Sequence, residues 1–134
     1  MAFVLDASIT ASWAFPDEIN RIATLALTRL RTSSAHVPGL CWFEIRNTLV
    51  MGERRNRITA IDTAAFLHDL THLDIAPDRA PDGARILYLA RLHRLTVYDA
   101  AYLELAGCLA LPLATLDTAL QRSAGEAGVT LLDN

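Results

Sequence analysis

Ala2-Phe3-Val4-Leu5, followed at once by Asp6, is the stretch of sequence that decides the fold class. Four consecutive apolar residues do not alternate as a half-exposed strand does. They predict instead a strand at the centre of a parallel sheet that helices cover on both faces. Asp6 then lies at the carboxyl end of that strand, the edge at which open α/β sheets bind their ligands.

The rest of the chain alternates short apolar runs with longer helical patterns, which is typical of a three-layer α/β/α domain. We expect one domain over residues 1–134, with a central parallel sheet of four to five strands. The further strands are predicted at residues 35–37, 73–76, 113–116 and 129–132.

Capping signals divide the intervening segments into helices. Asp17, Asp82 and Thr96 are expected to be N-caps, and Thr59-x-x-Asp62 has the spacing of a reciprocal capping box. The helices are predicted at residues 7–14, 17–31, 40–56, 59–72, 82–92, 96–108 and from 117 to 125 or 128.

Composition limits the classes of protein to which the chain can belong. The formal net charge of −3 excludes a global positive field that would hold nucleic acid non-specifically, so a phosphate partner must be held locally. No run reaches the roughly 18 apolar residues of a membrane span. Cys41 and Cys108 lack metal-ligand spacing, and both are expected to be small buried side chains in a reducing compartment. We therefore expect a soluble, cytoplasmic protein that has no membrane partner.

Two acids, Asp6 and Asp117, directly follow predicted strands. Both side chains are therefore expected at the carboxyl edge of the sheet, where a ligand would bind. An Asp between a strand and a helix can also serve only as an N-cap. For each residue taken alone, the sequence leaves both interpretations open.

Glu44 lies inside a predicted helix, and no basic residue stands at helical spacing to pair with it. Its helical neighbours Leu40, Asn47, Thr48 and Met51 are more apolar than charged. An unpaired carboxylate in such a stripe is expected to face the interior or a cleft.

Asp99 stands three residues after Thr96, the spacing of a capping box. The stripe that follows it consists of Tyr102, Leu103 and Ala106, which we take as apolar. This carboxylate is therefore also expected to face inward, although the cap explains it as well.

Three or four carboxylates in one crevice need a compensating cation, because two such charges about 4 Å apart cost about 4 kcal/mol at an effective dielectric near 20. Oxygen ligands without His or Cys favour Mg²⁺ or Mn²⁺ over Zn²⁺. Such a site suits phosphodiester hydrolysis. Ser8 and Thr115 fall near it and could bind substrate, or could only bond the local backbone.

Four motifs that contain these acids follow one another along the chain. They are Val4-Leu5-Asp6-Ala7-Ser8, Pro38 with Phe43-Glu44-Ile45-Arg46-Asn47, Thr96-Val97-Tyr98-Asp99-Ala100-Ala101-Tyr102-Leu103, and Ala114-Thr115-Leu116-Asp117. Their order and spacing resemble those of PIN-domain ribonucleases, and more narrowly the VapC toxins of bacterial toxin–antitoxin pairs. The resemblance extends to the closing Gly128-Val129-Thr130-Leu131-Leu132.

The resemblance implies a PIN-like fold and a Mg²⁺-dependent endoribonuclease, with Mn²⁺ as an alternative metal. By it, the catalytic and metal-binding carboxylates would be those of Asp6, Glu44, Asp99 and Asp117. Ser8, Asn47 and Thr115 would be supporting polar groups. It also implies a homodimer, and a cognate VapB-type antitoxin whose C-terminal segment covers the active site.

An RNA substrate requires local cations, and Arg46, Arg54 and Arg55 are candidate phosphate contacts. The cluster at residues 54–57 is explained equally well by the favourable placement of cations at a helix C-terminus. With 7% aromatic residues and no motif that indicates exposed aromatic side chains, a broad stacking platform is not expected.

Two other functions remain open from the sequence. The acidic site could belong to a non-catalytic interaction module that receives an Arg-bearing partner through bidentate pairing. The chain could also be a PIN nuclease of RNA processing outside any toxin pair. The apolar side of residues 59–72, formed by Ile61, Ala65, Phe66 and Leu70, could carry a dimer or antitoxin surface, or could pack on the core.

Overall fold

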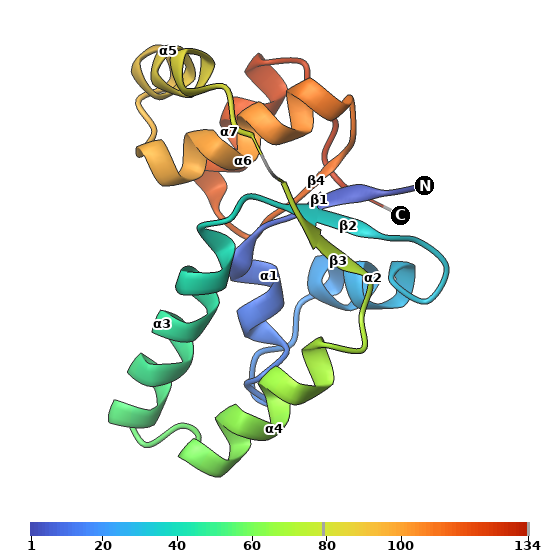
Figure 1. Ribbon diagram of the computed structural model, residues 1–134, viewed down its shortest axis with the longest axis vertical. Coiled ribbons are helices and arrows are strands. Elements are labelled where there is room, and N and C mark those ends of the chain that lie inside the picture. The colour runs from blue at the N-terminus through green and yellow to red at the C-terminus, as the bar shows by residue number, and fades with distance from the viewer. Residues whose placement is uncertain (79, 134) are drawn as a thin grey trace.

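Four short parallel strands form the centre of the computed structural model, in the order β3-β2-β1-β4. The structure describes residues 1–78 and 80–133. The strands are β1 (Phe3–Leu5), β2 (Ala35–Val37), β3 (Ile75–Pro77) and β4 (Leu113–Ala114). The helices are α1 (Ala7–Ser12), α2 (Arg21–Arg29), α3 (Cys41–Arg54), α4 (Ala60–Leu70), α5 (Gly83–His93), α6 (Val97–Leu109) and α7 (Thr118–Glu126). In Figure 1, α1 to α4 lie on one side of the sheet and α5 to α7 on the other. This confirms the predicted α/β fold class.

β1 is the central strand, as the apolar run at its position predicts. It pairs with β2 on one side and with β4 on the other, and α6 packs against it. All three of its side chains are completely buried. Burial of such side chains contributes about 1.5–3 kcal/mol each, so β1 anchors both the fold and the Asp that follows it.

The third strand lies further along the chain than the sequence pattern predicts. It spans Ile75–Pro77 instead of residues 73–76. The cause is the end of α4, where the Leu73 N–H still bonds to the carbonyl of Leu70 and completes a helical turn. The chain becomes extended only after that turn.

The last two predicted strands are shorter than expected. β4 ends at Ala114 instead of residue 116, since the next two residues bond to side chains. Residues 129–132 do not form a strand and contribute a single parallel bridge between Leu131 and Leu113. The sheet therefore has four strands, within the predicted range of four to five.

The cap of α2 differs from the prediction. α2 begins at Arg21, and the side chain of Asn20 accepts the N–H groups of Ile22 and Ala23 at 2.8 and 3.3 Å. Asp17 instead accepts a hydrogen bond from Arg57 at 3.0 Å. The prediction of Asp17 as the cap is therefore wrong.

Other predicted caps are confirmed. Thr59 and Asp62 form the reciprocal capping box of α4, with both hydrogen bonds at 3.1 Å. Asp82 caps α5, and the Thr96 hydroxyl accepts the Asp99 N–H at the start of α6.

The two cysteines have different environments. Cys41 is buried as predicted, whereas Cys108 is exposed, contrary to the prediction. The buried run of α6 ends at Ala106, so Cys108 falls on the last, outward-facing turn. In the part of the chain that the structure describes, no helix has the length and apolar character needed to cross a membrane.

Gly52 in α3 allows the helix to lie against a buried aromatic ring. A Cβ at this position would stand 2.6 and 2.7 Å from two ring atoms of Phe15, a side chain that is 2% exposed. We predict that Gly52→Ala lowers the free energy of unfolding by about 1–3 kcal/mol, because overpacking exceeds the helix-propensity gain of at most about 1 kcal/mol. Chemical denaturation measures the change.

The matched control is Gly107→Ala in α6, where a new Cβ meets no atom within 4 Å. This substitution should raise stability through helix propensity alone. A Gly52→Ala variant as stable as the Gly107→Ala variant would show that Phe15 moves aside at no cost.

Candidate active site

The sheet topology brings the two acids that follow strands to the same place. β1 and β4 are neighbouring parallel strands, with Leu5 opposite Ala114. Asp6 follows β1 directly, and Asp117 stands three residues beyond the end of β4. The chain leaves β1 for β2 on one side while β4 lies on the other side, so this edge is the point where strand order reverses.

The Asp6 carboxylate is 5% exposed and is held by two hydroxyl groups. Its Oδ2 accepts hydrogen bonds from Ser8 Oγ at 2.8 Å and from Thr115 Oγ1 at 2.6 Å. Asp6 occupies the N-cap position of α1 without a side-chain cap hydrogen bond. The capping interpretation therefore does not account for this residue.

The same two hydroxyls also bind the segment that carries Asp117. Ser8 Oγ accepts the Leu116 N–H at 3.1 Å, and Thr115 Oγ1 accepts the Asp117 N–H at 3.0 Å. Asp117 does cap α7, through the Leu120 N–H at 3.0 Å. For Asp117, then, the cap and the position at the sheet edge are compatible.

Glu44 reaches the same edge from the first turn of α3, where it is partly buried. Its Oε1 accepts a hydrogen bond of 2.6 Å from the hydroxyl of Tyr102 on α6. None of the ion pairs among residues 1–78 and 80–133 includes Glu44, in agreement with the missing basic neighbour in the sequence.

Tyr102 is a residue that the sequence analysis assigned only to an apolar stripe. It is completely buried, and its hydroxyl accepts the Ala7 N–H at 3.3 Å while it donates to Glu44. A buried tyrosine needs a partner for its hydroxyl, so its place on an otherwise apolar stripe is the signal that could have identified it. Burial raises the pKa of Tyr102 far above its usual range, which keeps the hydroxyl a donor. Burial likewise raises the pKa of the adjacent Cys41 thiol to about 12.

The four predicted acids lie close enough together to interact electrostatically. Burial raises the pKa of Asp6, of Glu44 and of Asp99, and in each case neighbouring carboxylates raise it further. Asp117 acts on Asp6, whereas Asp6 acts on both Glu44 and Asp99. Four acids from distant parts of the sequence therefore form one mutually repelling cluster.

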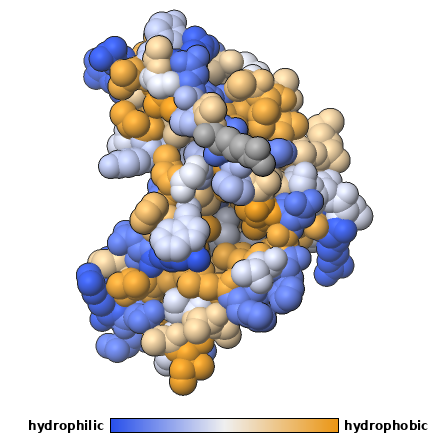
Figure 2. Space-filling model, in the orientation of Figure 1, coloured by the Kyte–Doolittle hydropathy of each residue, from blue (hydrophilic) through white to orange (hydrophobic). Residues whose placement is uncertain are grey.

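The cluster lies where β1, α3, α6 and α7 meet. In Figure 2 the outline of the molecule is indented between the part above the sheet and the part below it, on the side where α3 begins. Exposure differs across the cluster, since Asp6 is buried while Glu44, Asp99 and Asp117 are partly exposed. A ligand can therefore reach the partly exposed acids from solvent.

The donor set fits a hard divalent cation. It consists of carboxylate oxygens supported by the hydroxyls of Ser8 and Thr115, which suits Mg²⁺ or Mn²⁺. Within residues 1–78 and 80–133, no three His, Cys, Asp or Glu side chains lie close enough together to bind one metal ion. Binding a cation would therefore require the other carboxylates to move closer to that of Glu44, which the Tyr102 hydroxyl holds in place.

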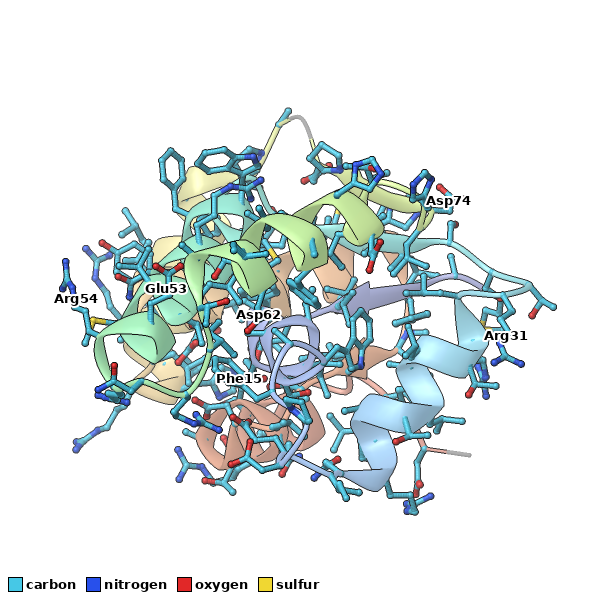
Figure 3. The ribbon with its side chains drawn as sticks, turned by 90° about the horizontal axis from the view of Figure 1, so that it is seen from below. Phe15, Arg31, Glu53, Arg54, Asp62 and Asp74 are labelled. Atoms are coloured by element: carbon cyan, nitrogen blue, oxygen red, sulfur yellow. The ribbon has the colours of Figure 1, made fainter. Side chains whose placement is uncertain are left out.

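The predicted RNA contacts do not lie at the cluster. Arg46 places its guanidinium 3.6 Å from the ring centroid of Trp42, and these two residues stand about 200° around α3 from Glu44. Arg54 and Arg55 are at the far end of α3, about 15 Å along the helix from Glu44. Figure 3 shows Arg54 pointing away from the molecule.

The remaining predicted polar residue, Asn47, is exposed one turn after Glu44 on α3. Arg54 stands in the last turn of that helix and Arg55 is its C-cap, in agreement with placement at a helix C-terminus. The structure thus gathers the four acids with Ser8 and Thr115, and leaves the arginines outside.

Several aromatic side chains are exposed, although the sequence contains no motif that indicates exposed aromatic residues. Trp42 is 55% exposed, Phe43 70% and Tyr98 62%. Trp42 and Phe43 contact each other edge to face with centroids 4.9 Å apart. Composition counts aromatic residues but does not locate them, and α3 buries only its stripe through Cys41, Ile45 and Leu49.

Comparison with known proteins identifies relatives over nearly the whole chain. The model of the PIN domain family matches residues 3–126. Ribonuclease VapC3 of Pyrobaculum aerophilum is 32% identical over an alignment of 124 residues that covers 90% of this chain and 92% of that protein.

Two solved structures show the same fold at lower identity. The crystal structure of PAE2754 from Pyrobaculum aerophilum has a TM-score of 0.73 at 20% identity and covers 92% of this chain and 84% of that one. FitAcB from Neisseria gonorrhoeae has a TM-score of 0.57 at 19% identity and covers 99% of this chain and 97% of that one. The family match and the VapC3 relative together show that the chain belongs to the PIN-domain family and to its VapC group.

Proposed function

We propose that the protein is a Mg²⁺-dependent endoribonuclease and acts as the toxin of a VapBC-type toxin–antitoxin pair. The observation that carries this proposal is the convergence of Asp6, Glu44, Asp99 and Asp117 at the carboxyl edge of the sheet. Membership of the PIN-domain family supports a nuclease, and the name of VapC3 supports RNA as the substrate.

The four acids have two kinds of role in this proposal. Asp6, Asp99 and Asp117 would hold the metal, and Glu44 would complete its shell or orient the attacking water. When bound, Mg²⁺ supplies positive charge to the phosphoryl oxygens and lowers the pKa of water. Ser8 and Thr115 would keep Asp6 oriented, since both donate to the same carboxylate oxygen.

The proposed partners follow from the family. A VapB-type antitoxin would inhibit the enzyme, and the chain would form a homodimer. Arg46, Arg54 and Arg55 are proposed contacts to RNA phosphates, with Asn47 as a supporting polar group beside Glu44. Because Arg54 and Arg55 stand at the far end of α3, they would contact RNA that flanks the cleaved bond and not the bond itself.

Mg²⁺ is expected to stabilise the folded protein, because it binds the assembled carboxylates and not the unfolded chain. At a free concentration about one hundred times its Kd, the gain in the free energy of unfolding is about 2.7 kcal/mol. Thermal unfolding with Mg²⁺ and with EDTA measures this shift. Cleavage of a mixed RNA pool under the same two conditions tests the activity.

Discrete cuts that require Mg²⁺, together with the thermal shift, would support the proposal. The absence of both cuts and a thermal shift at saturating Mg²⁺ would contradict the proposal. That result would favour the alternative in which the acidic cluster receives an Arg side chain of a protein partner.

A further inference from the structure

The side chain of Tyr102 connects three of the segments that build the acidic cluster. It belongs to α6, which also carries Asp99, and its hydroxyl lies 2.6 Å from Glu44 Oε1 on α3. The same oxygen lies 3.3 Å from the N–H of Ala7, the residue that follows Asp6. One hydroxyl thus touches the segments that present three of the four acids.

The direction of these hydrogen bonds is fixed by the atoms involved. A phenol hydroxyl has one proton, and the Ala7 N–H can only donate. The Tyr102 oxygen therefore accepts from Ala7, and its single proton is directed to Glu44. Glu44 thus has a permanent donor on one carboxylate oxygen, and its other oxygen takes part in no hydrogen bond within residues 1–78 and 80–133.

Core packing explains the ring of Tyr102 but not its hydroxyl. The ring is completely buried in the hydrophobic core, and a phenylalanine would fill the same space. Burying the polar hydroxyl costs free energy unless it forms hydrogen bonds with other buried polar groups. One of these partners is a carboxylate on a flexible side chain that would otherwise sample several rotamers on the flank of α3.

We propose that Tyr102 is a positioning residue of the active site, whose hydroxyl holds the Glu44 carboxylate toward Asp6 and Asp99 before a metal binds. This inference rests on the proposed nuclease function. Tyr102 touches neither metal nor substrate in this role and acts through Glu44. Pre-orientation of Glu44 removes the need to order it at the moment of metal binding, and so it strengthens that binding.

The substitution Tyr102→Phe tests this role because it removes the hydroxyl and keeps the ring. We expect the Mg²⁺ concentration that gives half of the thermal shift to rise about tenfold, in the range typical of groups that orient metal ligands. RNA cleavage at low Mg²⁺ should fall by a similar factor and recover partly at high Mg²⁺. The metal-free melting temperature should fall by no more than about 8 °C.

The matched control is Tyr98→Phe, one turn earlier on α6, where the tyrosine is 62% exposed. It should leave both the Mg²⁺ midpoint and cleavage unchanged. A second comparison uses Glu44→Gln with and without Tyr102→Phe. If Tyr102 acts through Glu44, its loss should change the Mg²⁺ midpoint less than twofold in the Glu44→Gln background.

The outcomes separate this inference from the proposed function. Wild-type protein that shows the Mg²⁺ shift and cleavage, beside a Tyr102→Phe variant with the same midpoint, would overturn the positioning role alone. Full additivity with Glu44→Gln would also overturn it, because the hydroxyl would then act independently of Glu44. Wild-type protein that neither binds Mg²⁺ nor cleaves RNA would overturn the nuclease function, and the positioning role with it.

Discussion

Asp99→Asn is expected to reduce RNA cleavage at least about a hundredfold. Residues that only orient metal ligands commonly contribute 10-fold to 100-fold, so the loss of a proposed ligand should cost at least as much. The variant keeps the size of the side chain and the Asp99 N–H bond to Thr96 that starts α6. The fold should therefore persist, and the change in cleavage should report on the missing charge.

The measurement is the rate of cleavage of one defined RNA fragment, recovered from the mixed pool, at saturating Mg²⁺. Asp69→Asn serves as the control, because Asp69 is an exposed acid on α4. It should cleave at the wild-type rate. A rate for Asp99→Asn within threefold of wild type would remove Asp99 from the proposed catalytic set.

The parts of the site that follow strands could be predicted from the sequence because their position depends on chain order alone. An apolar run such as Phe3–Leu5 has one stable place, in the middle of the sheet, and the acid after it must lie at the carboxyl edge. Asp117 follows by the same argument from β4. Glu44 could be placed because the absence of a basic partner at helical spacing is itself visible in the sequence.

Contacts between distant helices could not be predicted in this way. Tyr102 and Glu44 are 58 residues apart, and they become neighbours only through the tertiary packing that brings α6 and the start of α3 to the same edge of the sheet. The prediction of the α2 cap was wrong because Asp17 and Asn20 carry equivalent capping side chains three residues apart. The ion pairs of Arg57 with Asp17 and Glu18 decided between them, and no local pattern contains that information.

The exposed aromatic residues show a third limit of the sequence. Trp42 and Phe43 precede Glu44 in a helix whose buried stripe is narrow, so two large side chains face solvent. A low aromatic content argues against a broad stacking platform, but it gives the number of aromatic residues and not their positions. The apolar side of α4 is divided, because Phe66 and Leu70 are partly buried and pack against the core whereas Ile61 is 81% exposed. Its role as an interaction surface stays a prediction.

Without metal, the carboxylate cluster is expected to reduce stability progressively as the pH rises. The pKa values of Asp6, Glu44 and Asp99 are raised in the folded protein, chiefly by burial. Between the unfolded pKa of about 4 and the raised folded values, the folded state binds more protons than the unfolded state, so the free energy of unfolding falls with pH. The stabilisation that proton binding gives the folded state is fully present below about pH 4, and it is lost as the pH rises through the folded pKa values.

The measurement that isolates the effect is the difference in unfolding free energy between Asp99→Asn and wild type, determined by denaturant titration in EDTA at several pH values. Groups outside the cluster are the same in both proteins, so their contributions cancel in the difference. Asp99→Asn should become the more stable protein as pH rises, because it lacks a carboxylate whose charged form is disfavoured by burial and by the neighbouring acids. Saturating Mg²⁺ should reverse the order, because only wild type has the full set of carboxylates to bind it. If the difference in unfolding free energy does not change with pH, or if Mg²⁺ leaves it unchanged, Asp99 does not interact electrostatically with the other acids of the cluster.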